Sequence, residues 1–109
     1  MKVIKQSREY SKKEAYQIMH NKHLSLKDVP TDTEFELQDY IVYEDEKGTS
    51  VMVMFVESDN GQLTISTTSP SAIRDLTEAA DFFEAGILNL ALRRSQSKAG
   101  RTFMTLEVI

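Results

Sequence analysis

The sequence predicts an α+β domain dominated by β-strands, with five strands, a helix between the third and fourth strands and a further helix near the N-terminus. Three observations predict this fold. Apolar residues alternate or run together over five segments of strand length, turn residues separate these segments, and two other segments carry helix-start signals. With 109 residues the chain has room for one domain and one modest core.

The first expected element is a short helix introduced by a capping box. Ser11 and Glu14 have the spacing at which a hydroxyl and a carboxylate each bond a free backbone N–H at a helix start. An apolar stripe follows at helical spacing, formed by Ala15, Ile18 and Met19. The stripe is short, so we expect this helix to dock on the rest of the domain or on a partner. Leu26 and Val29 are expected to anchor the connection that follows.

Three strands are expected next, joined by short turns. The first covers residues 34–44, starts with apolar residues on one face and has them on both faces later. The second covers residues 51–56, is apolar on both faces and is expected to be central and buried. Asn60 and Gly61 predict a tight hairpin turn, and residues 62–67 form the third strand.

A second helix is expected after Ser69, its N-cap, with Pro70 at the first helical position and Gly86 as its end. The last two strands, residues 86–92 and 102–109, enclose a polar and basic connection, residues 93–101. This order of elements matches the OB-fold, a five-stranded Greek-key barrel that binds oligonucleotides and oligosaccharides. Some α+β sandwiches share the same order.

Several classes of protein are excluded or disfavoured by composition. The chain has no cysteine, which removes disulfides, thiolate metal sites and cysteine nucleophiles. It has neither an apolar run near 18 residues nor a signal-peptide pattern, so we expect a cytoplasmic protein that does not contact membranes. No P-loop, Gly-x-Ser-x-Gly or Rossmann pattern is present, and we expect neither catalysis nor a cofactor. His20 and His23 have no further ligand nearby in the sequence, so we expect no metal site.

The net charge of −4 hides a strong segregation along the chain. Residues 1–27 carry seven Lys or Arg against two acids (+5), residues 28–84 carry two against fourteen (−12), and residues 85–109 carry four against one (+3). An acidic surface repels the phosphate backbone of nucleic acids. Any nucleic acid is therefore expected to contact the basic ends of the chain.

Short motifs near the two ends of residues 26–109 resemble those of a known protein family. Residues 26–30 look like the short segment that precedes the first strand in that family. Near the C-terminus, a turn with Ser97, Lys98 and Gly100 precedes Phe103 and alternating aliphatic residues. In these features residues 26–109 resemble the small single-stranded DNA-binding proteins of tailed phages that replicate by protein priming. Residues 86–108 also resemble, more loosely, the last hairpin of bacterial single-stranded DNA-binding proteins.

The resemblance implies an OB-like barrel over residues 26–109. It also implies a phage or mobile-element protein that protects single-stranded DNA during replication, in the host cytoplasm if phage encoded. Residues 1–25 depart from the family as an N-terminal helical extension, which serves oligomerisation or a separate contact.

Non-specific binding of single strands needs cations along the backbone and aromatic rings on which bases stack. The candidate nucleic-acid-binding residues are Tyr40, Lys47, Arg93, Arg94, Lys98, Arg101 and Phe103. Tyr43 and Phe55 are expected to belong mainly to the core. If all four cations of residues 93–101 met phosphates, the salt slope would be only about −2.8, from about −0.7 per contact. We therefore expect modest affinity with cooperative binding, as a homodimer or higher oligomer.

A second interpretation is a protein-interaction module that does not bind nucleic acid. Such a protein would bind a host or phage partner, for example a replication protein, through its N-terminal helix and its acidic middle. The −12 across residues 28–84 favours this interpretation, whereas the strand order and the basic hairpin favour DNA binding. Deletion of residues 1–25 would separate the two, because only partner binding depends on the N-terminal helix.

Overall fold

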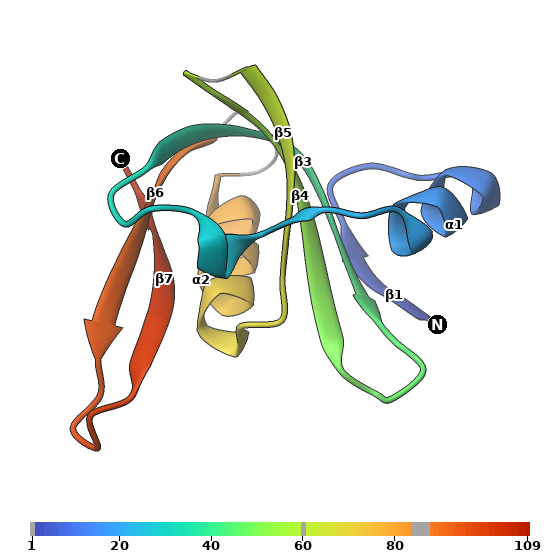
Figure 1. Cartoon of the computed structure of the whole chain (residues 1–109). Coiled ribbons are helices and arrows are strands. Elements are labelled where there is room, and N and C mark those ends of the chain that lie inside the picture. Colours follow the sequence, from blue (N-terminus) through green and yellow to red (C-terminus); the bar gives the residue numbers. More distant parts are fainter. Residues whose placement is uncertain (1, 60, 84–87) are drawn as a thin grey trace.

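The structure, a computed structural model, describes residues 2–59, 61–83 and 88–109. It is a mixed, mostly β protein with a curled open sheet and two α-helices (Figure 1). The elements in chain order are β1 (Lys2–Gln6), α1 (Lys12–His20), β2 (Leu24–Ser25), the 3₁₀ helix η1 (Leu26–Asp28), β3 (Glu34–Glu44), β4 (Ser50–Ser58), β5 (Gly61–Thr67), α2 (Pro70–Phe82), β6 (Leu88–Gln96) and β7 (Thr102–Val108). The sheet thus has seven strands where the sequence predicts five, because β1 and β2 were not predicted.

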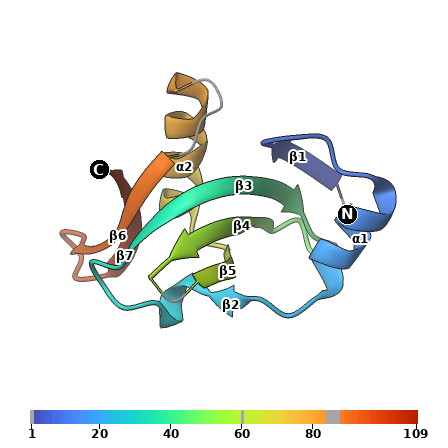
Figure 2. The same ribbon diagram turned by 90° about the horizontal axis from the view of Figure 1, so that it is seen from above.

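The strands pair in the order β2-β5-β4-β3-β6-β7, and β1 pairs with β3 outside this path. β3 is the longest strand, and its first half pairs with β6 while its second half pairs with β1. β6, β3, β4 and β5 therefore lie in Greek-key order, in which a fourth strand returns to lie beside the first. The sheet ends at β2 and β7, so it is an open half-barrel, which is compatible with the predicted OB-like fold. Figure 2 shows this band with β6 and β7 at one end and α1 with β1 at the other.

The main core lies between the sheet and α2. Leu76 of α2 and Leu90 of β6 are fully buried in it. Two hydrogen bonds fasten α2 to β7: the Ser71 hydroxyl donates to the Met104 carbonyl oxygen (2.6 Å), and the Asp75 carboxylate accepts from the Leu106 N–H (3.1 Å). The predicted start of α2 is confirmed, with Ser69 as N-cap and Pro70 in the first turn. Its predicted end, Gly86, lies outside the described residues.

The N-terminal segment covers a second, smaller cluster on the other side of β3 and β4. Ile41, Tyr43 and Val53 are buried there, and Ile18 and Met19 of α1 pack against them. The predicted capping box of Ser11 and Glu14 is present, and α1 ends at His20 with Asn21 as its C-cap. The prediction that α1 must dock on an apolar surface is therefore confirmed, and that surface is the protein's own sheet.

A register shift between Leu37 and Asp39 of β3 changes which side chains face the main core. Before the shift Phe35 and Leu37 face it, and after the shift Tyr40 and Val42 do. In a regular strand Tyr40 would share a face with Glu36 and Gln38 instead. The shift therefore turns Tyr40 inward.

The segment from α1 to β3 closes one side of the half-barrel. Leu26 and Val29 are both buried in the main core, as predicted. The turn between β4 and β5 is also confirmed, with Gly61 at φ +91°, whereas Asn60 lies outside the described residues. Within the described ranges, neither helix has the length and apolar character needed to cross a membrane.

Candidate nucleic-acid interface

The C-terminal hairpin is longer than the sequence predicts. β6 continues to Gln96, which pairs with Thr102, so Arg93 and Arg94 lie in a strand and not in the loop. The turn is confined to residues 97–101, where the Ser97 N–H donates to the Arg101 carbonyl oxygen (2.8 Å). Gly100 has φ +81°, a conformation that favours glycine.

Arg94 anchors the hairpin to the segment before β3. Its guanidinium donates to the Thr31 hydroxyl (2.6 Å) and to the carbonyl oxygens of Lys27 (3.0 Å) and Val29 (2.7 Å). These bonds fix the side chain against the segment before β3. The prediction that Arg94 lies in the connecting loop is wrong, whereas its contact with phosphate stays a prediction. All three partners are uncharged, and the positive charge of Arg94 still contributes to the local potential.

Arg93 is paired with two carboxylates. Its Nε donates to Glu107 (2.8 Å) and another guanidinium nitrogen donates to Asp32 (2.7 Å). The hydrogen bonds to Glu107 and then to Asp32 raise the pKa of Arg93. Because two negative charges surround one positive charge, Arg93 supplies no net attraction for phosphate. The prediction that Arg93 lies in the connecting loop is also wrong, since Arg93 is part of β6.

Lys98, Arg101 and Phe103 are brought together at the exposed tip of this hairpin. Lys98 and Arg101 lie in or beside the turn and are exposed. Phe103 is 36% exposed and points away from the core, because Met104 and Leu106 of the same strand are turned toward the core. Residues 88–106 contain no Asp or Glu. The tip therefore combines an accessible ring with two cations that have no ion pair among the residues that the structure describes.

Tyr40 and Lys47 do not join this group. Tyr40 is only 4% exposed, and burial raises the pKa of its hydroxyl. The prediction that Tyr40 offers an open face to a base is wrong, since the register shift in β3 buries it. Lys47 is exposed on the β3–β4 turn, but residues 44–46 of this turn are all acidic. Figure 1 places this turn and the β6–β7 turn on opposite sides of the molecule.

Four acidic residues of the middle segment gather on the outer face of the sheet. Glu36 of β3 lies directly opposite Glu57 of β4, an arrangement that is destabilising for like charges. A groove of about 310 Å³ lies there, and its described lining includes Glu34 and Asp59 but neither Lys nor Arg. This face repels phosphate, and none of its four acidic residues lies in the hairpin turn.

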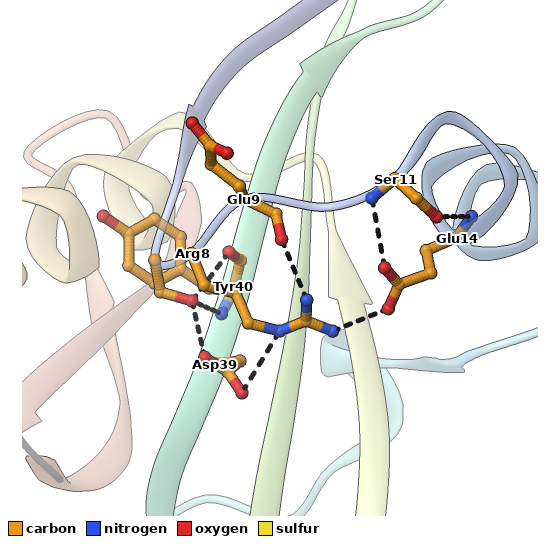
Figure 3. Close-up of polar contacts among 7 residues, drawn as sticks. Arg8, Glu9, Ser11, Glu14, Asp39 and Tyr40 are labelled. Carbon is orange, nitrogen blue, oxygen red and sulfur yellow. Dashed lines mark hydrogen bonds and ion pairs between the residues drawn. The ribbon is translucent and has the colours of Figure 1, made fainter.

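A larger groove, of about 600 Å³, lies between α1 and the strands β4 and β5. Arg8 lies in its wall and bonds the Glu9 carbonyl oxygen and the Glu14 carboxylate, both at 2.9 Å, with Asp39 at 4.0 Å (Figure 3). The Arg8 guanidinium also lies 4.0 Å from the centre of the Tyr10 ring. Its charge is thus balanced within the protein. Sequence reasoning missed this cluster, in which Asp39 comes from a distant strand while the other members lie close together in the chain.

Phe55 lines the same groove and is only partly buried. Its ring centre lies 6.5 Å from that of Tyr10, with the planes tilted by 32°. Tyr43, in contrast, is buried in the smaller cluster, as predicted. Phe55 therefore lies at the boundary of the core rather than inside it.

The ion pair of Glu14 predicts a pH dependence of stability. The hydrogen bond from Arg8, followed by the bond from the Ser11 N–H, lowers the pKa of Glu14 from 4.5 to about 2. Because the folded state has the lower pKa, ionised Glu14 stabilises the fold above its unfolded pKa, and this contribution is lost as the pH falls toward 2. We expect the melting temperatures of wild type and Glu14→Gln to differ at pH 7 and to converge near pH 2. Circular dichroism melts over this range measure the difference, and a gap independent of pH contradicts the assignment.

The two histidines contact the backbone of α1. His20 Nδ1 lies 2.8 Å from the Tyr16 carbonyl oxygen, and His23 Nε2 lies 2.5 Å from that of Ile18. Among the residues that the structure describes, no three His, Asp or Glu side chains are placed to hold a metal ion.

The sequence and the structure were compared with known proteins. No protein-family model, curated protein or solved structure matches the chain. The positions of the charged and aromatic side chains therefore carry the functional argument.

Proposed function

We propose that this protein binds single-stranded DNA without sequence preference, through the tip of the β6–β7 hairpin. The observation that carries the proposal is the exposed group of Lys98, Arg101 and Phe103 within a stretch, residues 88–106, that has no carboxylate. Cations that contact phosphates and rings that stack on bases are the two parts of sequence-tolerant single-strand binding.

The fold supports this proposal. If β3 is taken as the first strand of a Greek key, α2 stands between the third and fourth strands, as in an OB-like fold with β1 and β2 added. OB-folds contact their ligands through the loops between strands 1 and 2 and between strands 4 and 5. The corresponding turns here are β3–β4 and β6–β7, and only the second is basic. This difference supports a contact at the hairpin over one at the β3–β4 turn.

The biological part of the proposal follows the resemblance of residues 26–109 to phage single-stranded DNA-binding proteins. The protein would be encoded by a phage or mobile element and protect single strands during replication in the cytoplasm, without catalysis. Few cations are available at one tip, so tight coverage of DNA would require several copies on one strand. Self-association and contact with a replication protein are therefore included in the proposal.

Fluorescence anisotropy of labelled dT16 and of a duplex of the same length tests the proposal. We expect saturable binding that prefers the single strand, with a salt slope of at least about −1.4 from two phosphate contacts at about −0.7 each. A slope near zero, or equal binding of the duplex, would contradict non-specific recognition of single strands by this tip.

One observation favours a protein-interaction role as the second candidate function. Phe82 and Phe83 at the end of α2 are 79% and 50% exposed and pack edge to face, 5.0 Å between ring centres. Exposed aromatic residues are enriched where proteins bind partners. The Phe82→Ser/Phe83→Ser variant would lose such a partner in a binding assay with candidate replication proteins while keeping its DNA affinity. If the variant loses DNA affinity instead, the pair belongs to the DNA interface or to the fold.

A further inference from the structure

We propose that a second contact surface for single-stranded DNA lies on α1 and on the segment that joins α1 to η1, and that it continues the hairpin interface. The inference rests on the proposed function and extends it to the basic N-terminal part of the chain. Residues 12–27 carry four lysines, Lys12, Lys13, Lys22 and Lys27, and one carboxylate, Glu14.

The exposed side of α1 combines an aromatic pair with cations. Tyr16 is 63% exposed, and its ring stacks on that of His20 at 4.1 Å between centres. Lys12 and Lys13 lie one turn before Tyr16 on the same side of the helix and are exposed. This side of α1 has the same two components as the hairpin tip, a ring and nearby cations.

The only carboxylate of this segment is already neutralised. Glu14 bonds Arg8 (2.9 Å) and the Ser11 N–H (3.1 Å), and both contacts hold it against the N-terminal segment (Figure 3). The exposed lysines of α1 therefore keep their full attraction for phosphate.

The segment after α1 connects this surface to the hairpin. In Figure 1 the chain leaves α1, crosses in front of β4 and β5 and reaches η1. Lys22 and Lys27 are exposed along it, and the bond from Arg94 to the Lys27 carbonyl oxygen (3.0 Å) fixes its far end against β6. A row of cations thus leads from Tyr16 toward Lys98. On the outer face of the sheet, by contrast, the groove lined by Glu36 and Glu57 repels a strand.

The two surfaces lie at opposite ends of the sheet, in a molecule whose longest dimension is 40 Å (Figure 2). A short oligonucleotide can occupy only one of them, whereas a long one can bridge both. Single-strand sites of OB domains span about 4 to 16 nucleotides, so dT6 and dT16 are suitable probes.

The test compares Tyr16→Ala with the control Gln17→Ala, the next exposed position of α1. We expect Tyr16→Ala to weaken dT16 binding about fivefold or more, the lower limit for loss of one stacked base. Binding of dT6 is expected to fall by no more than about twofold, because the hairpin still accepts it. Gln17→Ala should change neither affinity, and circular dichroism melts check that both variants stay folded.

A second variant tests the row of lysines. Lys22→Ala/Lys27→Ala is expected to flatten the salt slope on dT16 by about 1.4, from about 0.7 per phosphate contact. Arg74→Ala removes a cation from the exposed surface of α2 and should leave the slope unchanged.

Unchanged dT16 binding by both Tyr16→Ala and Lys22→Ala/Lys27→Ala overturns the second surface. If Lys98 and Arg101 still control affinity in that case, the proposed function stands alone. Equal losses on dT6 and dT16 overturn the bridging arrangement. If the wild-type protein binds neither oligonucleotide, the proposed function and this inference fail together.

Discussion

The Lys98→Glu/Arg101→Glu variant is expected to bind dT16 at least about tenfold more weakly than the wild type, a loss of about 1.4 kcal/mol. Both side chains are exposed at the hairpin tip, and reversal of their charge turns attraction for phosphate into repulsion. The salt slope should flatten by about 1.4, since two contacts are lost. Anisotropy titrations at several salt concentrations measure both quantities.

A matched pair of single variants separates this local effect from a change in net charge. Lys98→Glu and Arg74→Glu change the net charge equally, and Arg74 is exposed on α2, outside the hairpin, with its guanidinium 3.7 Å from the Asp75 carboxylate. Only Lys98→Glu is expected to weaken binding. Equal losses in the two variants would mean that the whole-molecule charge, and not the hairpin tip, controls affinity.

Arg94→Ala is expected to lower the free energy of unfolding by about 2 to 3 kcal/mol. The substitution removes three hydrogen bonds from a charged donor, each worth about 1.5 to 3 kcal/mol before allowance for partial exposure and compensation by water. It also leaves the carbonyl oxygens of Lys27 and Val29 without this partner. Urea denaturation followed by circular dichroism measures the change.

Lys98→Ala is the control for this measurement, because Lys98 is exposed in the same hairpin and makes no side-chain bond to another residue that the structure describes. It should leave the free energy of unfolding within about 0.5 kcal/mol of the wild type. Equal stability of the wild type and Arg94→Ala would show that the Arg94 bonds are not structural and would return Arg94 to the list of free phosphate ligands.

The elements with local signals were predictable from the sequence. The span of β3 and the start of α2 are found where alternation, Ser69 and Pro70 place them. The capping box of Ser11 and Glu14 likewise predicts α1. These features depend on neighbouring residues, so they need no knowledge of the tertiary fold.

The register shift in β3 was not predictable from alternation. Strict parity groups Tyr40 with Glu36 and Gln38, whereas the shift between Leu37 and Asp39 places it with Phe35 in the core. The shift is defined by the pairing of β3 with β4, and strand pairing is a property of the tertiary structure. Tyr40, a candidate nucleic-acid-binding residue from the sequence, is therefore buried by the fold.

Loop length could have located the two arginines. β-Hairpin loops usually have two to five residues, whereas the predicted connection, residues 93–101, has nine; a shorter loop extends β6 to Gln96, which pairs with Thr102. Arg93 and Arg94 then fall within the strand. Their ionic and hydrogen-bonded partners, Asp32 and Thr31, come from a distant segment and have no signal near the hairpin.

β1 was missed because its sequence has no burial pattern to detect. It lies at an edge of the sheet, its side chains are almost all exposed, and it pairs only through its backbone with β3. Tyr10 and α1, which follow β1 in the chain, pack against the cluster of Ile41 and Val53. Deletion of residues 1–25 would expose this cluster, so point variants are a cleaner test of function than the truncation that the sequence alone suggests.

The most direct test of the proposed function is an NMR titration of the ¹⁵N-labelled protein with dT16. The account predicts salt-sensitive shifts of the backbone amides in residues 97–103, centred on Lys98, Arg101 and Phe103. Amides of the acidic outer face around Glu36 and Glu57 should stay unchanged. Shifts confined to that face or to the Phe82–Phe83 pair, or no shifts at saturating dT16, would contradict single-strand binding by the hairpin.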